Sequence, residues 1–273
     1  MPAPFDLTRF HSLLRTRAFG RNLIFEPTVG STMDVARDAA HRGAPEGTVA
    51  VADEQTAGRG RMGRSWLTLR AVNLASTMVL RPPSNVLHQV AMITPLAICH
   101  AVEDVASLRC DIKWPNDVQV GGKKLAGVLI ETEATIGDDA ESGGRAALPA
   151  ESVEFALVGA GINVNFNPNE FPEVRDIATS LLAELGRQAD REALLAAYLA
   201  HFERLYDAAK AGAPARAAWR ERLVTLGRRV HAAWPGGEAS GVAEDVDEGG
   251  SLIVRTADGG TVTVDAGDVT LRE

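Results

Sequence analysis

Cysteine is scarce in this chain: Cys99 and Cys110 are the only two, and both lie in apolar stretches without the spacing of metal ligands. We therefore expect two small buried side chains, and neither a disulfide framework nor a zinc site. No apolar run is long enough to cross a bilayer, and the N-terminus lacks the pattern of a secretory leader. These absences predict a cytoplasmic protein with no membrane partner.

An excess of positive charge is also missing. The formal net charge is −8, which argues against a general nucleic-acid binder, because phosphate contacts require a broad basic face. The cationic residues of interest are instead concentrated in a few segments, at Arg59, Arg61, Arg64, Lys113, Lys123 and Lys124. Such local concentration suits a small anionic ligand. The length of 273 residues leaves room for one large domain and one small one.

The densest motif is Gly-Arg-Gly-Arg-Met-Gly-Arg-Ser-Trp at residues 58–66. Glycine lets backbone N–H groups turn toward an anion, and arginine offers a planar fork of donors that matches phosphate or carboxylate oxygens. Trp66 adds a flat apolar face for a ring. The motif favours a nucleotide or a mixed anhydride as ligand. Glycine and arginine also occur together in solvated loops and in segments that bind RNA nonspecifically, so the motif alone leaves both interpretations open.

Four further motifs accompany it. Lys-Trp-Pro-Asn-Asp at 113–117 precedes Lys-Lys-Leu-Ala-Gly-Val-Leu-Ile-Glu at 123–131, which joins a polar cluster to an apolar strand. Gly-Ala-Gly-Ile-Asn-Val-Asn at 159–165 ends a buried run, and Gly-Ser-Thr stands at 30–32. In this order and at this spacing, the motifs resemble the catalytic domain of biotin protein ligases. The resemblance is strong over about residues 22–225 and looser beyond.

The resemblance implies an α+β fold. Its main part would be a mixed sheet flanked by helices, of the class II aminoacyl-tRNA synthetase and biotinyl-transferase type, in a biotin- and ATP-binding domain over residues 1–225. Residues 226–273, where short predicted strands alternate with glycine-rich turns, would form a small SH3-like β-barrel domain. Residues 1–22 are too few for the winged-helix domain with which some family members repress transcription, so no DNA partner is expected.

The implied reaction uses ATP and Mg²⁺ to convert biotin into biotinyl-5′-AMP, and then transfers biotin to a lysine of a partner protein. That partner would be the biotin carboxyl carrier protein of acetyl-CoA carboxylase or of a related carboxylase. We predict no metal site made by the protein itself. The identity of the carrier and the choice between a monomer and a homodimer stay open.

The motifs assign site residues by position. The resemblance implies biotin binding by Ser31, Thr32, Gln55, Arg59, Gly60, Arg61 and Lys124. It implies nucleotide binding by Arg61, Trp66, Asn116 and Asn163, with Trp66 stacked on adenine. The catalytic candidates are Lys124, Arg61 and Asp117. Lys124 would be the electrostatic catalyst, while Asp117 would orient magnesium or the incoming lysine.

Simpler interpretations accompany some of these assignments. Ser31 or Thr32 would cap the helix that follows, Lys124 would be a solvated hairpin residue, and Asp117 would cap turn amides. Met33 departs from the family, which usually has asparagine there, and this departure puts a side-chain hydrogen bond from that position in doubt. Trp114 is expected to be a packing residue.

The sequence is also compatible in part with three other functions. A lipoate protein ligase shares the fold and the adenylation chemistry, but the motifs at 58–66 and 113–117 favour biotin. A nonenzymatic RNA-binding module would show RNA affinity with a steep salt dependence and no need for ATP. A biotin-dependent repressor would need DNA-binding residues that are not seen.

Hydrophobic periodicity predicts the secondary structure. Helices are expected at 7–14, 32–41, 90–106, 191–209 and 215–223. Strands of the main sheet are expected at 49–54, 73–80, 112–114, 118–120, 125–132 and 153–158. Strands of the small domain are expected at 229–234, 239–245, 251–256 and 261–266. The polar segment 137–152 is expected to be a mobile loop.

Overall fold

The computed structural model describes residues 3–134, 153–234 and 236–272, and the predicted loop at 137–152 lies outside them. The larger of two sheets has seven strands in the order β1-β2-β3-β7-β6-β5-β4. These strands are β1 (Leu23–Val29), β2 (Val49–Gln55), β3 (Leu74–Leu80), β4 (Asp111–Lys113), β5 (Asp117–Val120), β6 (Lys123–Ala134) and β7 (Val153–Ile162). β1 and β2 are parallel and every other pair is antiparallel, so the sheet is mixed, as predicted.

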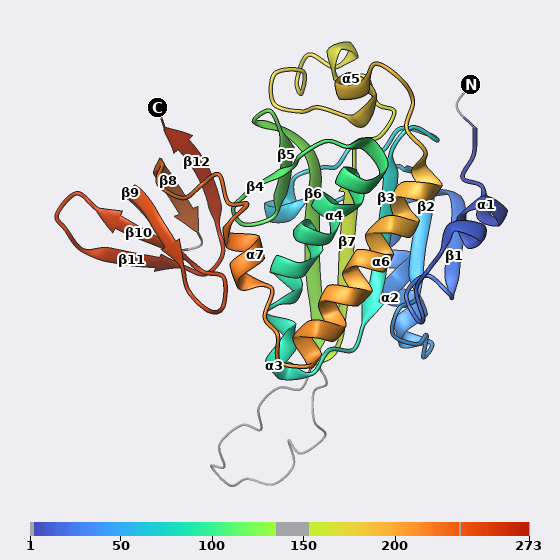
Figure 1. The fold of residues 1–273 in the computed structure, drawn as a ribbon, viewed down its shortest axis with the longest axis horizontal. Coiled ribbons are helices and arrows are strands. Elements are labelled where there is room, and N and C mark those ends of the chain that lie inside the picture. The colour runs from blue at the N-terminus through green and yellow to red at the C-terminus, as the bar shows by residue number, and fades with distance from the viewer. Residues whose placement is uncertain (1–2, 135–152, 235, 273) are drawn as a thin grey trace, which may run out of the picture.

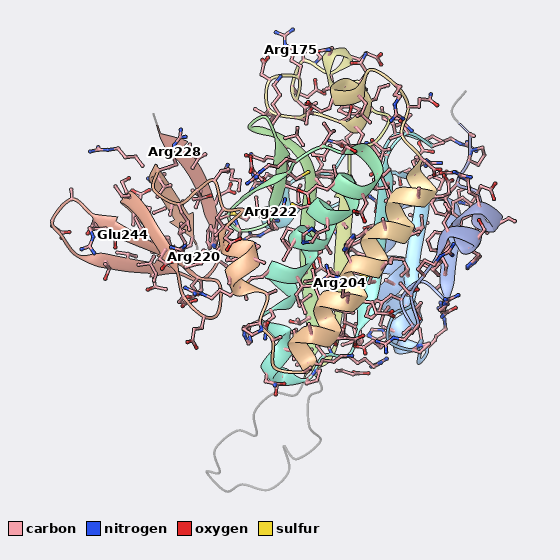
Figure 2. All side chains as sticks on the ribbon, in the orientation of Figure 1. Arg175, Arg204, Arg220, Arg222, Arg228 and Glu244 are labelled. Atoms are coloured by element: carbon pink, nitrogen blue, oxygen red, sulfur yellow. The ribbon has the colours of Figure 1, made fainter. Side chains whose placement is uncertain are left out.

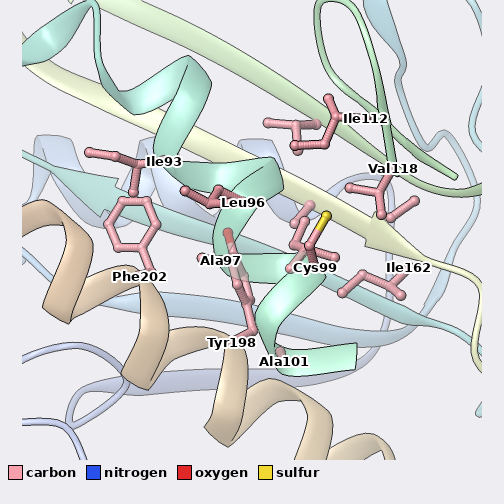
Figure 3. Packing of buried hydrophobic residues seen from close by; sticks show 14 of the residues in the cluster. Ile93, Leu96, Ala97, Cys99, Ala101, Ile112, Val118, Ile162, Tyr198 and Phe202 are labelled. Atoms are coloured by element: carbon pink, nitrogen blue, oxygen red, sulfur yellow. The ribbon is translucent and has the colours of Figure 1, made fainter. Parts of the chain in front are cut away.

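One face of this sheet is covered by α4 (Val90–Ala106) and α6 (Arg191–Lys210), which lie against each other (Figure 1). α4 is apolar on nearly all sides because it is enclosed between the sheet and α6. Ile93 and Leu96 of α4 pack with Tyr198 and Phe202 of α6 in the main core (Figure 3). Shorter helices flank this layer: α1 (Leu7–Leu13), α3 (Ser84–Leu87), α5 (Leu181–Leu185) and α7 (Arg216–Arg220).

The opposite face is covered by α2 (Thr32–His41). Successive residues of a strand point to opposite faces, and β3 shows the consequence. Met78 and Leu80 belong to the core beneath α4 and α6, whereas Val79 packs with Met33 and Ala36 of α2. Because both faces are covered, every residue of β3 is buried.

The smaller sheet has five antiparallel strands in the order β11-β10-β9-β8-β12. They are β8 (Arg229–Trp234), β9 (Gly237–Val246), β10 (Leu252–Thr256), β11 (Thr261–Val264) and β12 (Asp268–Arg272). Trp114 joins this sheet to the larger one, since its indole N–H donates to the Gly250 carbonyl at 2.9 Å. Arg222, which Figure 2 labels beside α7, forms an ion pair with Glu103 of α4.

Most predicted elements are confirmed within a few residues of their expected ends. Cys99 and Cys110 are buried and free, and Trp114 is a packing residue, as expected. β1, α3, α5 and β12 were not predicted. β1 contains Pro27 and lies at the sheet edge, where proline is tolerated but weakens a sequence signal. Within the described ranges, no helix is long and apolar enough to span a membrane.

Candidate active site

The floor of the site is a set of residues on the α2 face of the sheet that are small except for Leu129. Alternate residues of three neighbouring strands fall into two rows by register: Ala75–Gly161–Gly127 and Thr77–Gly159–Leu129. The next residues on this face of β3 and β7, Val79 and Leu157, are large and packed with α2. The small side chains therefore leave open a cavity of about 990 Å³ at this end of the sheet.

Polar groups gather where α2 begins. The Gln55 Oε1 oxygen accepts hydrogen bonds from the Thr32 backbone N–H at 2.9 Å and from its hydroxyl at 3.0 Å. Gln55 Nε2 donates to Thr68 Oγ1 at 3.0 Å, and Thr32 Oγ1 lies 2.8 Å from Thr77 Oγ1. The expected cap is also present, because Ser31 Oγ accepts from the Met33 N–H at 3.3 Å. Ser31, Thr32 and Gln55 are thus brought together as predicted.

Residues 58–66, which we call the clasp, form a short hairpin over the cavity. Gly60 N–H donates to the Arg64 carbonyl at 2.7 Å, and Trp66 N–H donates to the Gly58 carbonyl at 2.8 Å. At Gly58 a side chain is excluded, because a Cβ there would overlap the Trp66 carbonyl oxygen. At Gly60 a Cβ would make only ordinary contact, 3.4 Å from the Arg64 carbonyl oxygen.

The arginines of the clasp have different partners. Arg59 makes a two-pronged bond to Asp34 of α2, at 2.6 and 2.9 Å. Hydrogen bonding within this pair raises the pKa of Arg59 and lowers the pKa of Asp34. Arg61 instead donates to Asn116 Oδ1 at 3.1 Å, and burial lowers its pKa. Its guanidinium nevertheless stays cationic at neutral pH, so Arg61 presents a partly desolvated charge to the cavity.

Lys124 and Asp117 meet across β5 and β6. The Lys124 ammonium lies 2.7 Å from an Asp117 carboxylate oxygen and 5.5 Å from the centre of the Trp66 ring. Lys124 is held in the fold by its backbone, because its N–H donates to the Ile177 carbonyl at 2.8 Å and its carbonyl accepts from Thr179. The structure thus places Arg61, Asn116, Asp117 and Lys124 along the lining of one cavity.

Trp66 lies directly on the glycine row. A Cβ at Gly161 would overlap the indole, and a Cβ at Gly127 would approach it to 3.2 Å. The indole N–H is buried and has no hydrogen-bond partner among the described residues. Two adjacent glycines therefore serve as a flat platform for an aromatic ring, with a free donor beside it.

Asn163, at the end of β7, also lines the cavity. Its Nδ2 donates to the Thr179 carbonyl at 3.0 Å, and its Oδ1 lies 3.5 Å from Asn73 Nδ2. These bonds join the strand end to the segment that carries Ile177 and Thr179.

Met33, where the sequence departs from the family, belongs to the site. Met33 is buried, and its sulfur lies 2.8 Å from where a Cβ of Gly159 would stand. The position therefore supplies a backbone cap and an apolar side chain, and no side-chain hydrogen bond is available from methionine at this position. Thr77 and Asp34 also belong to the site, and the motifs did not predict them. The alternation of small residues in β3 and β7 could have predicted the floor of the cavity, but no local sequence pattern indicated the role of Asp34.

Comparison with known proteins gives the family. Residues 26–141 match the Biotin/lipoate A/B protein ligase family, and residues 225–272 match the Biotin protein ligase C terminal domain. The chain is 35% identical to the "Bifunctional ligase/repressor BirA" of Bacillus subtilis, over 90% of this chain and 73% of that protein. It belongs to the biotin protein ligase family.

Two further relatives agree with this assignment. The "Biotin--[acetyl-CoA-carboxylase] ligase" of Mycobacterium tuberculosis is 35% identical over 91% of this chain and 88% of its own length. The biotin protein ligase of Aquifex aeolicus, solved in complex with biotin and ATP, is 29% identical and superposes with a TM-score of 0.74, covering 92% of this chain and 99% of that one. The predicted family and the predicted fold are therefore confirmed.

Proposed function

We propose that this member of the biotin protein ligase family activates biotin with ATP to biotinyl-5′-AMP and transfers biotin to a lysine of a carrier protein. One observation carries the proposal: Arg61, Lys124 and the Trp66 ring line the same cavity. Thr32 and Gln55, which are hydrogen-bonded to each other, line that cavity too. The cavity is large enough for both substrates together.

The biotin head group would bind at the start of α2. A cyclic urea has one acceptor and two donors, and Ser31, Thr32 and Gln55 offer hydroxyl, amide and backbone groups that complement both kinds. Helix N-termini also favour electron-rich groups through their free N–H donors. Met33 and the small residues of the floor would contact the apolar part of the ligand. Arg59, Gly60 and Arg61 would cover the chain that leads to its carboxylate.

Adenylation makes the biotin carboxylate attack the α-phosphorus of ATP, and pyrophosphate leaves. Negative charge is spread over the phosphorus oxygens as the new bond forms. We assign its stabilisation to Arg61 and Lys124, which act as fixed donors in a partly water-excluded site. Asn116 orients Arg61 and Asp117 orients Lys124, so neither cation has to reorganise during the step.

Transfer makes an amine of the carrier attack the acyl carbon, and AMP leaves while the amine loses a proton. Asp117 would orient that amine, which it reaches from its place beside Lys124. The nucleotide would be held by Trp66, Asn116 and Asn163, with adenine on the free face of the indole. The position of Trp66 supports this role, because the ring is half-buried on the glycine row and lines the cavity.

Magnesium would enter with ATP and offset charge on the phosphates. Among residues 3–134, 153–234 and 236–272, no three His, Cys, Asp or Glu side chains are arranged to hold a metal. Three statements stay predictions: the domain division at residues 225 and 226, the cytoplasmic location and the absence of a DNA partner. The choice between a monomer and a homodimer stays open. We propose a biotin carboxyl carrier protein of acetyl-CoA carboxylase or a related carboxylase as the acceptor.

The direct test is intact mass spectrometry of a carrier domain incubated with the protein, ATP, magnesium and biotin. We expect the mass to rise by one biotinyl group, and to rise only when ATP is present. Lipoic acid in place of biotin tests the alternative, since the broader family includes lipoate ligases. A gain of mass with lipoic acid and none with biotin would assign the protein to that alternative.

A further inference from the structure

The outer arginines of the clasp are bound to acidic residues outside it. Arg59, at one end, pairs with Asp34, and Arg64, at the other, pairs with Asp268 at 2.7 Å. Arg61, between them, has no acidic side chain within ion-pair distance in the described part of the chain. All three arginines line the cavity, and Arg61 differs from the two anchored ones in having no acidic partner among the described residues.

The two anchors stand on different parts of the molecule. Asp34 lies in the first turn of α2, two residues after Thr32, and also accepts from Arg37 at 3.2 Å. Asp268 begins β12 of the smaller sheet. The clasp is therefore fastened on one side to the helix that begins at the Ser31–Thr32 cluster and on the other side to the C-terminal sheet.

We propose that Asp34 and Asp268 are positioning residues, which hold the clasp over the cavity through Arg59 and Arg64, so that Arg61 is the arginine of the clasp that binds the anionic ligand together with Lys124. The expected effect on enzyme kinetics rests on the proposed function. Glycine-rich segments lose much conformational entropy when they become ordered, and anchors at both ends reduce that cost before the ligand arrives.

The size of the effect is limited by solvent. The side chains of these pairs are 38% to 59% exposed, and ion pairs this exposed each contribute little to stability. Loss of one pair should therefore open the clasp about threefold more often, and loss of both about tenfold, because distant pairs act nearly additively.

Hydrogen exchange of the ligand-free protein tests the anchoring. We expect residues 58–66 to exchange about threefold faster in Asp34→Asn and in Asp268→Asn, and about tenfold faster in the double variant. Asp38→Asn on α2 and Glu244→Gln on β9 remove equivalent charges away from the clasp, and their double variant is the matched control. Exchange of the clasp at the same rate in both double variants would overturn the proposal.

A swap of charges between Arg64 and Asp268, and steady-state kinetics, provide two further tests. Arg64→Asp combined with Asp268→Arg should return the clasp to within about twofold of its original exchange rate, whereas Arg64→Asp alone should not. In steady-state assays, the Asp34→Asn and Asp268→Asn double variant should raise the KM for biotin about tenfold with kcat nearly unchanged, because uniform binding is lost. A fall in kcat at constant KM would contradict the proposal.

The exchange measurement needs no substrate. Anchoring of the clasp is therefore tested even in a protein that forms no biotinyl-AMP, whereas failure of the unaltered protein to form that product counts against the proposed function alone.

Discussion

Two cations reach the cavity from different elements. Arg61 comes from the clasp and Lys124 from the start of β6, and each is oriented by a polar neighbour. Fixed charges of this kind stabilise a transition state without reorganising. The sequence motif predicted both residues, but the partners Asn116 and Asp117 became evident as such only in the structure, because a pairing between side chains depends on how the strands align.

Removal of either cation should reduce adenylation. We expect Lys124→Ala and Arg61→Ala each to lower the rate of pyrophosphate release about 10- to 100-fold. This range corresponds to the loss of one charge-assisted contact, which contributes about 1.5–3 kcal/mol. Lys123→Ala is the matched control, since Lys123 is exposed and its ammonium donates to the Arg175 carbonyl, at 3.2 Å. An equal loss in Lys123→Ala and Lys124→Ala would remove the special role of Lys124.

Gly161 should be needed for nucleotide binding. In Gly161→Ala the added methyl group would take the place of the Trp66 indole, and the ring would have to move. We expect the affinity for ATP to fall about tenfold or more, because the proposed contact between adenine and the Trp66 ring would be lost, while the affinity for biotin should change less. Isothermal titration with each ligand measures this. Gly249→Ala, where a Cβ comes no closer than 3.4 Å to its neighbours, is the control.

At the scale of elements, the site depends on which strands lie next to one another. Small residues of β3, β6 and β7 are far apart in sequence, yet their register brings them into two rows. Alternation predicted which residues of one strand share a face, but it could not predict the order β3-β7-β6. The same limit applies to Asp34 and Asp268, whose partners lie 25 and 204 residues away along the chain.

The clasp offers a matched comparison between two of its own glycines. Gly58→Ala should disorder the hairpin, because a methyl group there would overlap the Trp66 carbonyl oxygen. Gly60→Ala should be accommodated sterically, with a nearest contact of 3.4 Å. We expect the KM for biotin to rise about tenfold in Gly58→Ala and by about twofold at most in Gly60→Ala, on the scale of a lost contact. Similar KM values in the two variants would contradict this account of the hairpin.

At the scale of the whole molecule, a buried ion pair ties the site to the rest of the catalytic part. Arg191 of α6 lies 2.7 Å from Asp53 of β2, and the two side chains are 5% and 3% exposed. Asp53 also accepts from the Phe5 N–H, and Arg191 donates to the Ala3 carbonyl. The N-terminal segment, β2 and α6 thus meet at one point, two residues from Gln55. Neither the charge pattern nor the periodicity of the sequence indicated this pairing.

Breaking this pair should destabilise the protein. We expect Asp53→Asn to lower the free energy of unfolding by about 3–5 kcal/mol, because Arg191 keeps a buried charge without its carboxylate partner. Asp207→Asn, which removes a half-buried partner of the exposed Arg17, should cost about 1 kcal/mol or less. Urea denaturation of the two variants measures the difference. A similar small loss in both would show that the buried pair contributes little.

The most direct measurement of the central claim uses the unaltered protein with biotin, ATP and magnesium and no carrier. Quenched samples analysed by mass spectrometry should contain biotinyl-5′-AMP in amounts that match the pyrophosphate released, and Lys124→Ala should accumulate it about 10- to 100-fold more slowly. Pyrophosphate release without that product, or equal accumulation in the two proteins, would contradict the account.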